Sequence, residues 1–527
     1  MTRRLSSTGR PYKTADVRSG PTGGKPPVDA AVDRGPGRVS PGQVPAGFIP
    51  ARLQARVVTD AFGPGFRTVE TEYRDHEPRV EGTVPPWLSG ALVRNGPGRF
   101  EVGGERVNHW FDGLGMLRRY AFDGGEVRYT NRFLRSEAHA DAISGETGAQ
   151  FATDTRGWRR FLSWLRTLGP QPTDNANVHV ARLDGEYVAL TEAPRRVAFD
   201  PVTLETRGEF TFDDDITEHL AAAHVRHDPH RGETVGFATQ FGLDPKIHVY
   251  RLPDGERRRR QVASLDAGGP GYIHDVSVTA DRVVLVEPPL DIVPRRVLYP
   301  WTEGVFDLLE WNPDRGTRVV VLDRESGAVR LDTTIEPVFV FHHVNAYDDD
   351  RAVVLDVVDF ADADIVGSMA LDELDGSGFP NVPDGRLARY RIDLDSGAVT
   401  RERRYDGGME LPRVVRARRG RRHRYAYGQT TDRTGANGLA KVDCKRDRAS
   451  EWWERSVFVE EPLPVRRPDT DTEDDGVVLA TALDVDREQS YLLVFDAATL
   501  EERARVFLPH PEPFGFHGRF FRDVDGR

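Results

Sequence analysis

The stretch "TRVVVLDRESGAV" occupies residues 317–329 and shows most clearly how this chain folds. A run of β-branched residues ends at Asp323, a polar turn containing Gly327 follows, and strand composition resumes at Ala328. β-Branched runs bounded by Asp, Ser and Gly are typical of two strands joined by a tight turn. We therefore predict a β-hairpin over these residues.

Hairpins of this kind recur along the chain. Their turns begin at Asp123, Asp200, Asp254, Asp323, Asp393, Asp443 and Asp496. The intervals of 77, 54, 69, 70, 50 and 53 residues are irregular, but four-stranded blades with unequal loops produce such spacing. The pattern predicts an all-β chain folded as a seven-bladed β-propeller. The alternative is that such turns merely occur wherever strands are joined.

Two segments differ from this β-rich texture. Residues 1–45 are rich in Gly, Pro, Arg and Ser, and we expect a disordered tail there and one propeller domain over residues 46–527.

Residues 154–170, "DTRGWRRFLSWLRTLGP", have helical periodicity with arginines opposite an apolar side. Such a helix either contacts a membrane surface or packs on the propeller rim. The candidate membrane contacts are Trp158, Phe161, Leu162, Trp164 and Leu165.

Composition excludes several classes of protein. The net charge of −12 and the pI near 5.7 argue against a nucleic-acid partner. No window holds eighteen consecutive apolar residues, so no membrane span is expected. A single cysteine, Cys444, excludes an internal disulfide and a Cys-rich metal site. No secretory signal is recognisable, and we expect a cytoplasmic protein.

Four of the fifteen histidines stand beside β-rich runs. They lie in "AAAHVRHDP" (His224), "GYIHDVSVT" (His274), "FVFHHVNAYD" (His342, followed by His343) and "PFGFHGRFF" (His517). Intervals of 50, 68 and 175 residues are far too long for a local metal site. In a propeller, however, the innermost strands of different blades meet at the axis. The sequence is therefore compatible with an all-histidine site for Fe(II), although each histidine alone also fits a structural role.

Beyond these histidines, the chain resembles the carotenoid cleavage oxygenases from about Gly82 to Phe521. The likeness begins in "VPPWLSGALVRNGPGRFEVGGERVNHWFDGLGML", which contains Arg94-Asn95-Gly96-Pro97-Gly98 and Phe111-Asp112-Gly113. It continues through "TDNANVHV", "ALTEAPRRVAFDPVTLET", "WNPDRGTRVVVLDR", "YAYG" and "EDDGVV". The resemblance implies a seven-bladed propeller with a helical and loop cap over an axial metal site.

The resemblance also implies a ligand set. The Fe(II) ligands would be His224, His274, His342 and His517, with His342 preferred over His343 because Asn345 stands three residues after it. Val225 departs from the proline that many relatives carry after the first ligand. Three glutamates would hydrogen-bond ligands: Glu192 to His274, Glu410 to His342 and Glu461 to His517.

The activity implied is addition of both atoms of dioxygen across a conjugated C=C bond of a carotenoid or apocarotenoid. Such polyenes reside in membranes, so residues 158–168 are expected to contact the inner face of the membrane peripherally. Residues 286–301, "VEPPLDIVPRRVLYPW", would line the substrate passage. No obligate protein partner is implied.

Three alternative functions remain on the same scaffold: a stilbene-cleaving dioxygenase, a retinoid isomerohydrolase, and a non-catalytic carotenoid- or lipid-binding propeller. The stilbene cleavers use a Tyr and a Lys to polarise a phenol. No lysine lies between Lys25 and Lys246, which counts against that branch. The bond that is cleaved stays open.

Overall fold

The computed structural model describes residues 63–145, 172–267, 271–293, 295–296, 304–377, 382–433 and 435–524. The tail predicted for residues 1–45 and the helix predicted for residues 154–170 lie outside these ranges. The boundary between tail and propeller domain therefore stays a prediction. All structural statements below concern the described residues.

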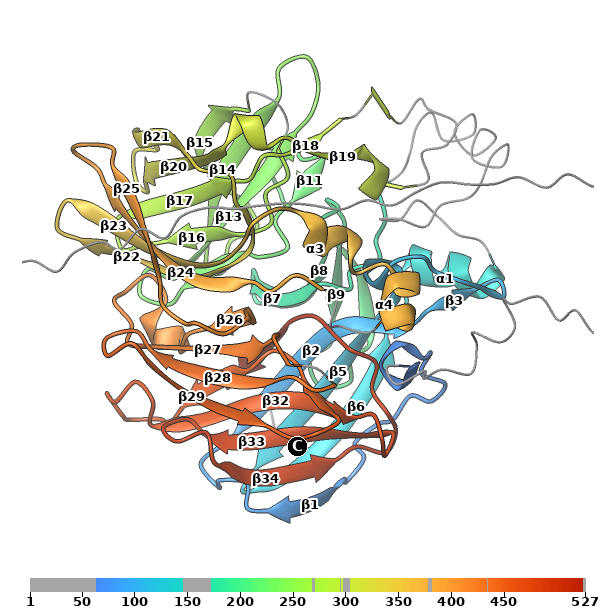
Figure 1. Ribbon diagram of the computed structural model, residues 1–527. Coiled ribbons are helices and arrows are strands. Elements are labelled where there is room, and N and C mark those ends of the chain that lie inside the picture. The colour runs from blue at the N-terminus through green and yellow to red at the C-terminus, as the bar shows by residue number, and fades with distance from the viewer. Residues whose placement is uncertain are drawn as a thin grey trace, which may run out of the picture. The chain divides into compact units, whose positions relative to one another are not determined.

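Seven antiparallel sheets form the blades of a β-propeller (Figure 1). From the axis outward, the first blade contains β35 (Gly518–Phe521), β2 (Gly90–Arg99), β5 (Leu114–Asp123) and β6 (Glu126–Phe133). The second contains β7 (His179–Leu183), β8 (Glu186–Leu190), β9 (Arg196–Phe199) and β10 (Thr206–Phe210). The third contains β11 (Leu220–Ala221) and β12 (Arg226–Asp228), which share a partner, then β13 (Glu233–Gln240), β14 (Lys246–Pro253) and β15 (Arg260–Asp266).

The remaining four blades follow the same order. The fourth contains β16 (Val276–Val278), β17 (Arg282–Glu287), β20 (Thr317–Asp323) and β21 (Val329–Ile335). The fifth contains β22 (Phe339–Asp349), β23 (Ala352–Phe360), β24 (Arg386–Asp393) and β25 (Val399–Arg403). The sixth contains β26 (Met409–Arg413), β27 (Tyr425–Thr430), β28 (Gly438–Asp443) and β29 (Arg448–Trp453). The seventh contains β30 (Val457–Val459), β31 (Leu463–Arg466), β32 (Gly476–Asp484), β33 (Gln489–Asp496), β34 (Glu502–Phe507) and β1 (Arg79–Gly82).

The two ends of the described chain close the ring of blades. The last strand, β35, pairs with β2 through partners such as Ala91 and Phe521, so the first blade combines both ends of the sequence. The early strand β1 pairs with β34 of the seventh blade. Because the closing strands are hydrogen-bonded, these two blades are tied together. The predicted seven-bladed propeller is confirmed.

Every turn predicted from sequence joins the third and fourth strands of a different blade. The seven turns connect β5–β6, β9–β10, β14–β15, β20–β21, β24–β25, β28–β29 and β33–β34. In the turn that begins at Asp323, Oδ1 accepts hydrogen bonds from the backbone N–H groups of Glu325 at 3.2 Å and Ser326 at 2.9 Å. This local chemistry explains why Asp marks the turns.

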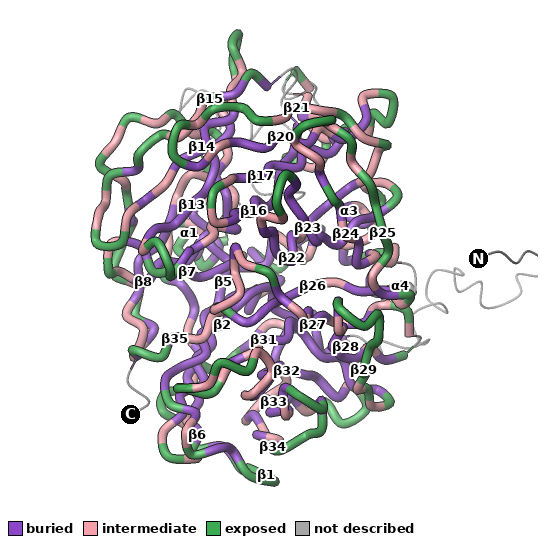
Figure 2. Tube along the Cα trace, turned by 90° about the vertical axis from the view of Figure 1, so that its left-hand side faces the viewer, coloured by how far each residue is buried: buried purple, intermediate pink, exposed green. Residues whose placement is uncertain are grey.

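Burial follows the distance of a strand from the axis. All residues of β23 are buried, whereas β25, the edge strand of the same blade, is almost wholly exposed (Figure 2). The apolar cores therefore lie between neighbouring blades rather than outside them. One core cluster, which includes Phe339, Phe341, Val358 and Met409, leads toward the axis.

Short helices and hairpins, most of them inserted between two strands of one blade, gather at one end of the propeller (Figure 1). They include α1 (Glu137–Ser144), α3 (Asp364–Gly367), α4 (Leu371–Ser377), the 3-10 helices η3 (Trp110–Asp112) and η5 (Phe306–Leu308), and the hairpins β3–β4 (Glu101–Val102, Glu105–Arg106) and β18–β19 (Leu290–Ile292, Leu309–Trp311). Further 3-10 turns are η2 (Gly63–Phe66), η6 (Pro313–Arg315) and η8 (Arg416–Arg418). Among the described residues, no helix has the length and apolar character needed to cross a membrane.

Candidate metal centre

The four candidate histidines come from the innermost strands of four blades. His517 directly precedes β35, His224 lies between β11 and β12, His274 stands two residues before β16, and His342 lies within β22. Since these strands surround the axis, residues as far apart in sequence as His224 and His517 become neighbours.

Their side chains converge on one point. One ring nitrogen from each histidine lies within 4.8 Å of the other three, and only His342 is not fully buried. Ring centroids are 4.4 Å apart for His224 and His517, and 4.6 Å apart for His224 and His274. The Nε2 atoms of His342 and His517 are 3.2 Å apart.

Three glutamates hold three of these rings by their other nitrogen. His274 Nδ1 donates to Glu192 Oε1 at 2.6 Å, and His342 Nδ1 donates to Glu410 Oε2 at 2.6 Å. His517 Nδ1 donates to Glu461 Oε1 at 2.8 Å. A carboxylate can only accept, so it fixes the proton on Nδ1 and leaves the Nε2 lone pair bare. Within the described part of the chain, no carboxylate binds His224.

The arrangement of nitrogen atoms fits a cation. His342 Nε2 and His517 Nε2 face each other as two lone pairs, with no proton available to join them. His224 Nε2 is buried and has no hydrogen-bond partner among the described residues. Buried polar atoms without partners are costly, and a metal bound by all four nitrogens would remove that cost. Four imidazoles suit Fe, Zn, Cu or Ni.

Burial keeps the imidazoles of His224 and His517 neutral, which is the form that binds metals. Burial lowers the pKa of His517 to about 3, although Glu461 opposes the shift. The pKa of His224 lies well below its ordinary value because of burial and the crowding of His517, His274 and His342. Burial alone would raise the pKa of Glu461, but Arg413, His517 and Arg94 together hold it well below its ordinary value.

The neighbouring histidine, His343, faces away from this cluster. Its Nδ1 lies 2.9 Å from Ser277 Oγ, and its backbone N–H donates to Asp275 Oδ2 at 2.9 Å. Burial lowers its pKa to about 4, so it too is neutral. Successive residues of a strand point to opposite faces, which explains why only one of the pair joins the cluster.

Sequence reasoning missed three side chains near the cluster. Tyr272 O–H lies 2.8 Å and 2.9 Å from the two Glu192 oxygens, and its position two residues before His274 was the available signal. Arg413 Nε donates to Glu461 Oε1 at 2.7 Å. His179 contributes from the second blade, with its ring centroid 5.4 Å from that of His517. No sequence pattern singled out Arg413 or His179.

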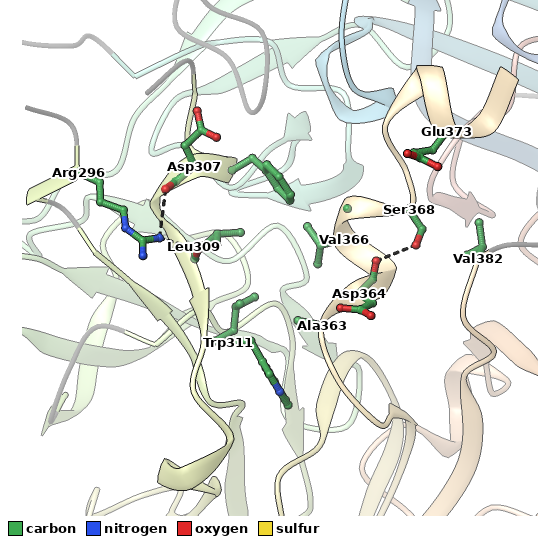
Figure 3. A pocket seen from close by; sticks show the side chains of 13 residues that line it. Arg296, Asp307, Leu309, Trp311, Ala363, Asp364, Val366, Ser368, Glu373 and Val382 are labelled. Carbon is green, nitrogen blue, oxygen red and sulfur yellow. Dashed lines mark hydrogen bonds between the residues drawn. The ribbon is translucent and has the colours of Figure 1, made fainter. Parts of the chain in front are cut away.

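A cavity of about 590 Å³ opens beside η5, β19 and α3 (Figure 3). We call it the apolar cavity; its walls include Leu290, Phe306, Leu309, Trp311, Ala363, Val366 and Val382, with Arg296, Asp307, Asp364, Ser368 and Glu373 also among its lining residues. The apolar walls belong to or pack against the core cluster that contains Phe341, and the Phe341 ring centroid is 5.0 Å from that of His274. Packed apolar side chains therefore connect the wall of this cavity with His274. Leu290 and Arg296 come from the passage predicted at residues 286–301; residues 297–301 lie outside the described ranges.

The predicted membrane contacts cannot be placed beside this cavity. Trp158, Phe161, Leu162, Trp164 and Leu165 all lie outside the described residues. Their role stays a prediction from sequence.

Comparison with known proteins identifies the family of this chain. The sequence profile of the family described as "Retinal pigment epithelial membrane protein" matches residues 66–522. The chain belongs to this family. The match includes all four histidines and all three glutamates, and the resemblance to the carotenoid cleavage oxygenases is confirmed.

Relatives within the family cover most of the chain. Carotenoid cleavage dioxygenase 8, chloroplastic, of Arabidopsis thaliana is 30% identical over 487 residues, covering 86% of this chain and 84% of that protein. The beta,beta-carotene 15,15'-dioxygenase of Homo sapiens is 27% identical over 505 residues, covering 85% and 92%. The cobalt-substituted ACO of Synechocystis superposes with a TM-score of 0.79 at 25% identity, covering 88% and 98%.

Proposed function

We propose that this protein is a non-haem Fe(II) dioxygenase that cleaves one conjugated C=C bond of a carotenoid or apocarotenoid into two carbonyl products. The observation that carries the proposal is the convergence of four imidazole nitrogens, three of them oriented by glutamates. The names of the relatives as carotenoid dioxygenases support the substrate class.

The residues that would hold Fe(II) are His224, His274, His342 and His517. Bound there, Fe(II) would supply the binding and activation of dioxygen. The glutamates keep the proton on Nδ1 of each partner ring, so Nε2 stays free for the metal. Neutral imidazoles leave the metal charge uncompensated except through Glu192, Glu410 and Glu461.

The apolar cavity is suited to a polyene. Its aromatic and aliphatic residues would contact an apolar chain, and its few polar lining residues could orient a terminal group, so length and shape would select the substrate. Holding one double bond beside the histidines is the main task left to the protein. A surface contact with lipid through residues 158–168 would supply the substrate, and its support is the sequence pattern alone.

The activity is tested with iron-loaded protein and a panel of carotenoids and apocarotenoids in detergent, followed by chromatography. We expect paired carbonyl products, each carrying label from isotope-labelled dioxygen. Unlabelled alcohol would instead indicate the retinoid isomerohydrolase. An unchanged carotenoid spectrum with substoichiometric iron would indicate the non-catalytic carrier.

The ligand assignment is tested with a matched pair of histidine variants. His517→Ala should lose both iron and turnover, because one nitrogen and its Glu461 anchor are removed. His343→Asn, which can preserve the contact with Ser277, should keep both. Glu410→Gln should keep iron but slow turnover by about ten- to a hundredfold, the range found for partners of ligating histidines. Full activity in His517→Ala would refute the assignment.

A further inference from the structure

A second, much smaller cavity adjoins the four-histidine cluster. Its volume is about 10 Å³, and its lining includes two histidines and four arginines: His179, His224, Arg226, Arg413, Arg419 and Arg519. We call it the arginine cavity. Among the described residues, no carboxylate lines it.

Two of the four arginines have carboxylate partners and two do not. Arg226 Nε donates to Asp275 Oδ1 at 3.1 Å, and Arg413 Nε donates to Glu461 Oε1 at 2.7 Å. Arg419 and Arg519 have no carboxylate oxygen within 4.0 Å in the described ranges. The cavity therefore holds two positive charges that neighbouring carboxylates do not neutralise.

Several nitrogens at this cavity also lack hydrogen-bond partners. Arg519 Nε and His179 Nδ1 are buried, and neither has a partner in the described part of the chain. His179 as a whole is only 7% exposed to solvent. Burial, together with the nearby Arg413, Arg519, Arg226 and Arg416, holds the pKa of Arg419 well below its ordinary value. Such crowding of like charges is costly without a counter-ion.

The same sequence motifs that carry the histidines carry this cavity. Arg226 follows His224 by two positions, and Arg519 follows His517 by two. Each of these arginines therefore reaches the cavity from the same short segment as a histidine of the cluster.

Asn345, three residues after His342, fixes the loop that brings Arg419 to the cavity. Its Nδ2 donates to the carbonyl oxygens of Arg418 at 3.0 Å and Arg421 at 2.9 Å. Its Oδ1 accepts from Gly420 N–H at 2.9 Å. The backbone on both sides of Arg419 is thereby held, so the fold itself positions this guanidinium at the cavity.

We propose that the arginine cavity binds one small monovalent anion, of the size of chloride, through Arg419, Arg519 and Nδ1 of His179. The uncompensated charge selects an anion, and guanidinium and imidazole N–H groups are its natural donors. The volume of the cavity limits the size of the anion, because roughly 10–15 Å³ suits a single water-sized species. A tetrahedral oxyanion would require the walls to move. The proposal does not depend on iron or on the reaction.

The probe is bromide, used with the full-length protein in both metal-free and iron-loaded forms. Crystals grown in sodium bromide should show one anomalous scattering peak in the arginine cavity. The thermal unfolding midpoint should rise saturably with chloride at constant ionic strength, with gluconate as the replacement anion, because an anion that binds only the folded state stabilises it.

Four variants assign the effect to this cavity. Arg419→Gln and Arg519→Gln should each weaken halide binding by about tenfold or more, since each removes a charge-assisted donor. The control is Arg422→Gln on the same loop, where Arg422 pairs with Asp349 at the surface and should not influence halide binding. Arg519→Lys keeps the charge and should retain part of the affinity if the glutamine variants do not fold.

Three results would overturn the proposal. One is a cavity that holds only water at bromide concentrations where surface arginines are already occupied. Another is an unfolding midpoint that is equal in chloride and gluconate. The third is binding of phosphate at this position without binding of halide, which would contradict the inferred size.

Discussion

The apolar cavity and the arginine cavity have opposite chemistry. The apolar cavity is about 590 Å³ in volume and has mainly aromatic and aliphatic walls. The arginine cavity is about 10 Å³ in volume and concentrates four guanidinium groups. The arginine cavity is lined by the inner strands β7, β12, β26 and β35 and residues beside them, whereas the apolar cavity is lined by β18, β19, η5, α3 and α4, which are inserted between strands of the fourth and fifth blades.

Three of the motifs show how this change is encoded. Tyr272 precedes His274 and Asp275 follows it; Phe341 precedes His342; Arg519 follows His517. Tyr272 and Phe341 belong to the apolar core cluster, whereas Asp275 pairs with an arginine of the other cavity. At His274 the chain passes from the apolar region to the charged region, so the histidines mark the boundary between the two.

The largest loss of stability is expected at Glu461, where a buried carboxylate pairs with a buried arginine beside the histidines. Glu461→Ala removes the partner of Arg413 and His517 and leaves Arg413, which is only 7% exposed, as an unpaired buried charge. Breaking a buried pair in this way costs about 3–5 kcal/mol. Urea unfolding of the metal-free protein measures the loss.

Glu192→Ala is the matched control for this variant. Glu192 is partly exposed and has no arginine among its partners, Tyr272 and His274, so its loss leaves no buried guanidinium unpaired and should cost clearly less stability than the loss of Glu461. Equal losses for both variants would show that buried charge does not distinguish the two positions.

A second prediction concerns a titratable group on the apolar side. His109 Nε2 donates to the carbonyl oxygen of Val366, which lines the apolar cavity, and its Nδ1 accepts from Phe111 N–H. Burial lowers its pKa from 6.5 to about 4. The unfolded chain therefore binds a proton as pH falls below 6.5 while the folded protein does not. Stability from this group is present at pH 7 and should fall by about 2 kcal/mol by pH 5.

His109→Asn isolates this contribution. Asparagine can accept from Phe111 N–H as the histidine does, but it does not titrate. The variant should be less stable at pH 7 and should lose less stability than the wild type between pH 7 and pH 5. Parallel losses in urea unfolding at the two pH values would remove His109 from the explanation.

The fold was predictable because its signals are local. Asp323 caps its own turn through neighbouring backbone N–H groups, and the same contacts recur at the turns that begin at Asp200, Asp393, Asp443 and Asp496. Each hairpin can therefore be recognised without knowledge of its neighbours. The number of such turns then gives the number of blades.

The site was predictable only in part, and the reason is distance along the chain. His224 and His517 could be named from motifs, but His179 and Arg413 acquire their roles through contacts with residues far away in sequence. The arginine cavity had no signal of its own, because arginine is the common basic residue throughout this chain. Only the assembled axis distinguishes Arg419 from an ordinary surface arginine.

The smallest effect is expected at the wall of the apolar cavity. Leu309 in β19 lines this cavity and is partly exposed, so Leu309→Asp should be tolerated by the fold. A carboxylate there must lose water when a polyene enters, which should raise KM for a carotenoid by about tenfold, or 1.4 kcal/mol, with little change in kcat. Leu309→Asn, of similar size but uncharged, should raise KM less, and Arg422→Gln should leave it unchanged. If Leu309→Asp and Arg422→Gln have the same KM, the polyene enters by another route and the assignment of the two cavities fails.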